Sequence, residues 1–137
     1  MSLKKIEKKA QAVLNALDSP DGELSILIVD DPQIAILNKE YLNRQGPTNV
    51  IAFPMRDGGF ADLNPHLLGD VVISVETARR EGGDARISTQ ARLSQLLVHG
   101  ILHLFGYDHE KDDEARRMEK KSDELLEMLR QMFLQAV

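Results

Sequence analysis

The chain has 137 residues, of which 42% are hydrophobic and 28% charged, and its formal net charge at pH 7 is −5. This length and composition are typical of one globular domain rather than a disordered chain, and the acidic balance argues against a protein coated in nucleic acid without excluding a local basic groove. The absence of cysteine excludes disulfides, thiolate metal ligands and cysteine nucleophiles, so a transition-metal site must use His, Asp, Glu or water.

Helices and strands are mixed in the first half of the chain. Residues 4–17 have the apolar spacing of an amphipathic helix, and turn residues then precede a short apolar strand over 24–29. Asp30 is a suitable N-cap and Pro32 suits a first helical turn, so a second helix should run to about Leu42. Its inward-facing side chains should be those of Ile34, Leu37 and Tyr41. A second strand is expected over 49–53 and a loop over 56–65.

The second half of the chain predicts one more strand and three helices. The strand is expected over residues 68–75, and a short helix over 77–81 should end at Gly82 and Gly83. Ser88 is the expected N-cap of a long helix that stops at Gly106. A last helix should span residues 113–133, with its inner side formed by Met118, Leu125, Leu129 and Met132.

These elements together predict an α+β fold. We expect a single domain over residues 1–137, with a small mixed sheet of three to four strands and about four helices. No apolar run approaches the ~20 residues that cross a bilayer, and the charged N-terminus lacks the apolar segment of a secretory signal. A cytoplasmic monomer that does not engage membranes is therefore expected.

Three of the four histidines fall within eleven residues, in the run His99-Gly-Ile-Leu-His103-Leu-Phe-Gly-Tyr-Asp-His109. Two histidines four residues apart on a helix lie on one face, so both imidazoles can reach one ion. Gly106 allows the chain to reverse after the helix and bring the third histidine back. Three nitrogen ligands with an open fourth position are typical of a catalytic zinc site, although imidazole also suits other divalent transition metals.

The spacing also equals that of the metzincin proteases, H-E-x-x-H-x-x-G-x-x-H. Those enzymes use the glutamate after the first histidine as general base, whereas this chain has Gly100 there. A glycine inside a helix costs about 1 kcal/mol relative to alanine, so we expect it to serve close packing or to leave room for substrate. Peptide hydrolysis is therefore the second hypothesis rather than the first.

The same run resembles the signature of the YbeY family of bacterial zinc-dependent endoribonucleases, H-G-x-L-H-L-x-G-Y-D-H. Residues 47–54 are similar to that family's T-[DN]-V-L-S-F-P segment and residues 68–74 to its L-G-D-[IV]-x-I-[SC] strand. Residues 112–119 match the segment that usually follows the third histidine. The resemblance covers about residues 24–130.

The resemblance implies one Zn²⁺ bound by His99, His103 and His109 and cleavage of single-stranded RNA. It implies a part in rRNA processing, including maturation of the 16S rRNA 3′ end, and in ribosome quality control, with the small ribosomal subunit as partner. Family members commonly carry an arginine at the position of Leu42, and Arg44 is the candidate to replace it as a catalytic residue. Ala52 stands in place of the usual serine, which we expect to matter for structure only.

Several residues outside the three histidines are candidates for roles at this site. Asp108 can orient a ligand imidazole or cap the turn, Asp70 can border the site or end a strand, and Met118 can pack beneath the metal or in the core. His66 is expected to be solvated. Arginine suits phosphate, so the candidate phosphate contacts are Arg44, Arg56, Arg79, Arg80 and Arg86.

Three functions follow, in order of preference. The first is a metal-dependent endoribonuclease, a hydrolase of phosphoester bonds. The second is a metzincin-like hydrolase of peptides or small esters. The third is a catalytically weak ribosome-associated binding protein, which Leu42 in place of arginine suggests.

Overall fold

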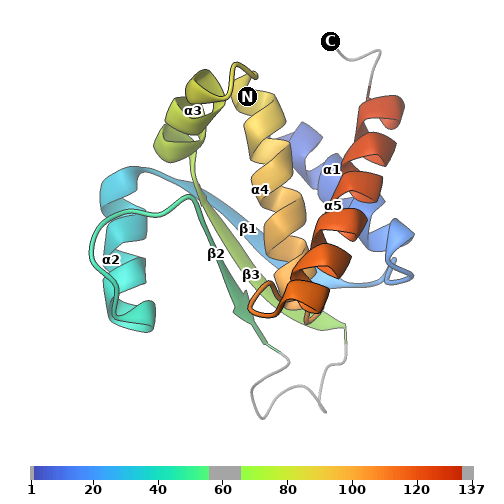
Figure 1. The fold of residues 1–137 in the computed structure, drawn as a ribbon, viewed down its shortest axis with the longest axis horizontal. Helices are drawn as coiled ribbons and strands as arrows, with labels where there is room; N and C mark the ends of the chain where they lie inside the picture. The colour runs from blue at the N-terminus through green and yellow to red at the C-terminus, as the bar shows by residue number, and fades with distance from the viewer. Residues whose placement is uncertain (1, 56–65, 134–137) are drawn as a thin grey trace.

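A computed structural model describes residues 2–55 and 66–133, so the loop expected over 56–65 lies outside the described residues. Within these two ranges the elements follow one another in the order α1, β1, α2, β2, β3, α3, α4, α5 (Figure 1). The predicted α+β class is confirmed, and the five helices in the described ranges lie at the five places where the sequence predicts helical segments. None of the helices in these ranges is long and apolar enough to span a membrane.

The sheet is small and mixed, as predicted. Its strands are β1 (Glu23–Val29), β2 (Val50–Pro54) and β3 (Leu67–Ser74), in the spatial order β1-β3-β2. The central strand β3 runs parallel to β1 and antiparallel to β2. Because β3 is buried along most of its length, its sequence is a nearly continuous apolar run.

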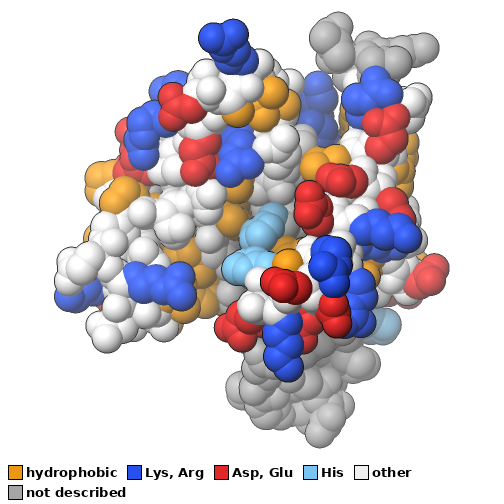
Figure 2. Space-filling model, in the orientation of Figure 1, with side chains coloured by type: hydrophobic (Ala, Val, Ile, Leu, Met, Phe, Trp, Pro, Cys, Tyr) orange, Lys and Arg blue, Asp and Glu red, His pale blue; other side chains and the backbone are white. Residues whose placement is uncertain are grey.

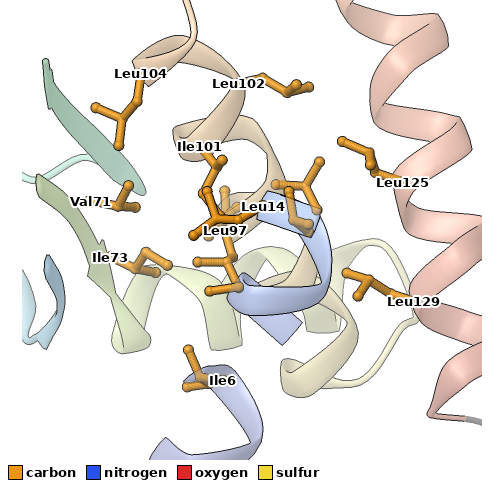
Figure 3. Packing of buried hydrophobic residues seen from close by; sticks show 14 of the residues in the cluster. Ile6, Leu14, Val71, Ile73, Leu97, Ile101, Leu102, Leu104, Leu125 and Leu129 are labelled. Carbon is orange, nitrogen blue, oxygen red and sulfur yellow. The ribbon is translucent and has the colours of Figure 1, made fainter. Parts of the chain in front are cut away.

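One face of the sheet carries the main hydrophobic core. It is covered by α1 (Leu3–Ala16), α4 (Thr89–Leu104) and α5 (Asp112–Met132), and α4 contacts both β2 and β3 (Figure 1). Leu97 and Ile101 of α4 lie at the centre of this core, between the sheet and the other two helices (Figure 3). The core therefore fixes α4, the helix that bears two of the histidines, from several sides.

The other face of the sheet carries a smaller apolar cluster under α2 (Asp31–Leu42). Ile34 of α2 packs against Ile51 and Val72, which point away from the main core because side chains alternate along a strand. The expected N-cap is confirmed: Asp30 accepts a hydrogen bond from the Gln33 backbone N–H at 2.9 Å, and the Asp30 N–H donates in return to the Gln33 side chain.

Two apolar side chains expected to face inward are exposed. Tyr41 is 65% exposed, because the buried stripe of α2 is narrow, with Ile34 and Asn38 as its buried residues, and the Tyr41 ring makes only an edge-to-face contact with Phe53. Met132 is 60% exposed. The inner stripe of α5 continues from Leu129 to Phe133, four residues further on, and not to Met132, three residues further on. These two expectations are wrong.

The third helix also differs from its predicted extent. Helix α3 spans Val75–Asp84, so it begins directly after β3 and contains the two glycines that were expected to end it. Gly82 is buried where α3 meets the start of α4: an added Cβ there would lie 3.2 Å from the carbonyl oxygens of Ile87 and Ser88. Close packing, rather than helix termination, explains this glycine.

Candidate metal centre

The structure brings His99, His103 and His109 together at one point of the surface. The first two lie on α4, and His109 lies in the turn between α4 and α5. The Nε2 atoms of His99 and His103 are 3.1 Å apart, and one nitrogen from each of the three rings lies within 4.8 Å of the others. Figure 2 shows histidine side chains near the centre of this face, in a hollow open to solvent.

The end of α4 explains how the third histidine returns. Gly106 adopts φ +90°, and its N–H donates to the His103 carbonyl at 3.0 Å while the Tyr107 N–H donates to the Leu102 carbonyl at 3.0 Å. This pair of bonds is the Schellman motif, which satisfies the last carbonyls of a helix and reverses the chain. The predicted role of Gly106 in ending the helix is confirmed.

The surroundings favour the neutral imidazole at His99 and His103. Burial lowers the pKa of His99 to about 4, helped by the positive charges of its two partner histidines and of Arg92. Burial also lowers the pKa of His103, although the Asp108 charge and a hydrogen bond to the Tyr107 backbone oppose the shift. A neutral imidazole has the free lone pair that a metal ligand needs.

This donor set fits a transition-metal ion. Three imidazole nitrogens converge on one point, and the surface around them leaves one side open. Imidazole nitrogen is a ligand of intermediate softness that suits zinc and its neighbours among the transition metals rather than magnesium or calcium. The cluster can therefore hold such an ion while leaving a position for a substrate.

Gly100 has the packing role that was expected of it. An added Cβ would lie 2.7 Å from Cγ1 of Val71 and 3.3 Å from Cγ2 of Val50, so α4 rests directly on β2 and β3 at this point. A glutamate here, as in the metzincin motif, would point into the sheet rather than toward the histidines. The residue that separates this motif from a protease motif is thus fixed by the fold.

The two acidic candidates differ in their relation to the histidines: the charge of Asp108 acts on His103, whereas Asp70 lies in the sheet. The Asp108 carboxylate accepts the His109 backbone N–H at 2.7 Å, so it caps the turn, the second of its two expected roles. Asp70 lies within β3 rather than at its end, on the face opposite Val71 and therefore away from α4. It neither borders the site nor forms a turn.

Two further candidates have structural roles. Met118 is buried in the main core, as one of its two interpretations predicted. His66 is exposed and lies outside the three-histidine cluster, and its carbonyl accepts the Glu23 N–H at 2.7 Å. Of the four histidines, three therefore share the site, and His66 lies just before β3, where its carbonyl bonds to the start of β1.

The predicted arginine candidates are dispersed. Arg44 is exposed just after α2, Arg79 is exposed on α3, and Arg86 is exposed at the end of α3. Arg80 pairs with Asp31 at 2.7 Å and holds α3 to α2, so it has a structural partner. Arg56 lies outside the described residues. None of the four described candidate arginines is among the groups whose charge acts on His99 or His103.

Sequence reasoning missed Arg92, the arginine whose charge acts on His99. It lies seven residues before His99, two helical turns away on the same face of α4, and both residues line a cavity of about 310 Å³. The i, i+7 spacing from Arg92 to the first histidine was the available signal, but it is common on amphipathic helices and so was easily overlooked.

A small α+β fold with three imidazoles converging at an open surface defines a protein of the metal-dependent hydrolase class. A sequence model of the family described as Endoribonuclease YbeY matches residues 1–130. The Endoribonuclease YbeY of Syntrophotalea carbinolica is 48% identical over 136 residues, covering 98% of this chain and 91% of the relative. That of Geobacter metallireducens is 50% identical over 127 residues, covering 91% and 85%. The chain belongs to the YbeY family, and the predicted resemblance is confirmed.

The fold has a counterpart among solved structures. The solution structure of a Thermotoga maritima protein superposes with a TM-score of 0.70 at 22% sequence identity, covering 98% of this chain and 85% of that one. At this identity the likeness concerns the fold alone. It supports the arrangement of helices around a small mixed sheet.

Proposed function

We propose that this protein is a metal-dependent endoribonuclease that cleaves single-stranded RNA at the three-histidine site. The observation that carries the proposal is the convergence of His99, His103 and His109 at an open surface of a YbeY-family chain. The relatives named above are called endoribonucleases, and they favour neither a peptide hydrolase nor a binding protein without activity. Gly100, which takes the place of a protease's general base, points the same way.

In this proposal the three histidines hold one Zn²⁺. When bound, such an ion supplies Lewis-acid activation of a phosphodiester and of water. The chain's own contribution is to fix the ligands: α4 holds two imidazoles rigidly against the core, and the Gly106 turn sets the third. Arg44 is a proposed phosphate contact, because it is exposed and can move its guanidinium toward bound RNA.

The cellular role that we propose is processing of ribosomal RNA, including the 3′ end of 16S rRNA, and quality control of ribosomes. The small ribosomal subunit would be the partner and the cytoplasm the location. Support comes from membership of the YbeY family, whose resemblance implies these roles.

Cleavage of a purified single-stranded RNA by the zinc-loaded protein tests the activity. We expect cleavage that chelator abolishes and that His103→Ala lowers at least a hundredfold, since one of three ligands is lost. His66→Ala is the matched control, because it removes the histidine outside the cluster and should leave the rate unchanged.

Two outcomes would overturn this function. RNA cut equally well by wild type and His103→Ala would show that the cluster is not the nuclease site. Cleavage of casein by the wild type, lost in the same variant, would assign the cluster to peptide hydrolysis instead.

A further inference from the structure

The cavity beside His99 joins three elements that are distant in sequence. Asn49 and Val50 come from the start of β2, Arg92 and Gln95 from α4, and Asp123 from α5. Its volume of about 310 Å³ is at the lower end of the range for small-ligand pockets. The cavity therefore has room for one nucleotide unit next to the histidine cluster.

The Arg92 guanidinium is held in a fixed orientation in this cavity. Its Nε and Nη2 donate to Oε1 of Glu81 at 3.1 and 3.0 Å, and its Nη1 donates to Oε1 of Gln95 at 2.7 Å. Asn49 donates to the same Glu81 carboxylate at 3.2 Å. This network ties α3, α4 and the start of β2 together, and the Arg92 side chain stays 25% exposed.

These bonds use three of the five N–H groups of Arg92 within the described residues. One N–H is left on each of the two terminal nitrogens, and a guanidinium N–H is a strong, charge-assisted donor to a phosphate oxygen. Asp123 on the opposite wall repels an anion, so a phosphate would lie against α4. Arg92 thus offers a preorganised phosphate contact two helical turns from the first histidine.

We propose that Arg92 binds a backbone phosphate of single-stranded RNA adjacent to the one at the histidine cluster, with its nucleotide in the cavity between α4 and α5. This inference rests on the proposed function for its choice of ligand. Helix α4 then has a second role, because one face of this helix carries the phosphate contact at its start and two metal ligands near its end.

The test measures RNA binding without turnover. A labelled ten-nucleotide single-stranded RNA is titrated with protein in excess chelator, over a range of salt concentrations. For Arg92→Gln we expect Kd to rise about five- to tenfold at low salt. The slope of log K against log salt should become shallower by about 0.7, the value for one phosphate contact on a single strand.

Two further variants sharpen the result. Arg130→Gln is the matched control, because Arg130 also pairs with a glutamate, Glu127, through Nε and Nη2, but lies near the end of α5. It should change neither Kd nor slope. Arg92→Lys keeps the charge but not the fork, so it should keep the slope and lose part of the affinity.

Each outcome decides between the claims. A folded Arg92→Gln or Arg92→Lys protein that matches the expectation above supports the inference. Wild-type Kd and slope in Arg92→Gln, an equal change in Arg130→Gln, or no RNA binding by the wild type would overturn it. If the wild type binds RNA with an Arg92-dependent salt slope but does not cut the RNA whichever metal is added, the binding inference stands and only the proposed cleavage is wrong.

Discussion

The three histidines are positioned by two kinds of backbone, a helix packed in the core and a turn. His99 and His103 are fixed by α4, whose Leu97 and Ile101 lie at the centre of the main core. His109 depends instead on the turn that Gly106 allows and that Asp108 caps. Two ligand positions are therefore set by the fold, and the third by a few local hydrogen bonds.

Leu42 provides a test of phosphate recognition at the residue scale. It is 42% exposed at the end of α2, so a longer charged side chain fits there without repacking, and the resemblance to the YbeY family predicts an arginine at this position. We expect Leu42→Arg to raise the rate of RNA cleavage several-fold. Leu42→Gln, which lengthens the side chain without adding charge, should leave the rate unchanged. A rate that does not rise in Leu42→Arg would mean that Arg44 or Arg92 already meets this need.

The sequence was sufficient to find the histidines but not the arginine beside them. The histidines share one run of eleven residues whose spacing has a direct geometric meaning on a helix. Arg92 is held by Glu81 of α3, and the same carboxylate accepts a hydrogen bond from Asn49, the residue just before β2. Contacts of that kind depend on how the elements pack, which a local pattern does not specify.

Helix α4 packs closely against β2 and β3 at Gly100. An added methyl group would lie 2.7 Å from Cγ1 of Val71, which is completely buried, so Val71 or the helix would have to shift. We expect Gly100→Ala to destabilise the protein by about 1–2 kcal/mol, because overpacking outweighs the gain in helix propensity. Chemical denaturation measures this change. Gly83→Ala, where nothing lies within 4 Å of the added carbon, is the matched control and should be neutral or stabilising.

Helices α2 and α3 are joined at their N-termini through Asp31. Its carboxylate accepts hydrogen bonds from the Ser74 and Thr77 hydroxyls, both at 2.6 Å, and pairs with Arg80 at 2.7 Å. These three partners, the hydroxyls foremost, lower the pKa of Asp31 to about 2. The ionised carboxylate is therefore more stable in the folded chain than in the unfolded one.

This junction predicts a pH dependence of stability. Because the folded pKa lies below the unfolded value of about 4, the contribution is complete above pH 4 and is lost as the pH falls toward 2. Asp31→Asn should lower Tm at pH 7 through the loss of charged hydrogen bonds, worth about 1–3 kcal/mol in total. The Tm difference between the two proteins should shrink below pH 4. A difference that stays constant down to pH 2 would contradict the assignment.

Element boundaries were predicted well where a local signal exists. The Asp30 cap and the Gly106 stop are local, and both are found as predicted. The predicted end of α3 was wrong. A glycine pair such as Gly82 and Gly83 often ends a helix, whereas here Gly82 allows close contact with the turn that follows α3. Tyr41 was predicted to face inward but is exposed. How much of α2 the sheet covers depends on the order of the strands, which the apolar spacing of the sequence does not indicate.

At the scale of the whole molecule, a bound metal should stabilise the fold. An ion that binds only the native state at a concentration one hundred times its Kd adds about 2.7 kcal/mol, or roughly ten degrees in Tm for a chain of this size. We expect a chelator to lower the Tm of the wild type by this amount and to leave that of His103→Ala unchanged. An unchanged melting curve after confirmed removal of the metal would contradict this prediction.

The unequal hydrophobic clusters on the two faces of the sheet have a consequence for motion. The α2 face has three buried apolar residues, Ile34, Ile51 and Val72, whereas the other face is covered by three helices with a much larger core. Local opening costs least where few apolar contacts are lost, so amide hydrogens of α2 should exchange with solvent well before those of α4. Such openings would leave the histidine-bearing helix folded while α2, with position 42 at its end, detaches from the sheet.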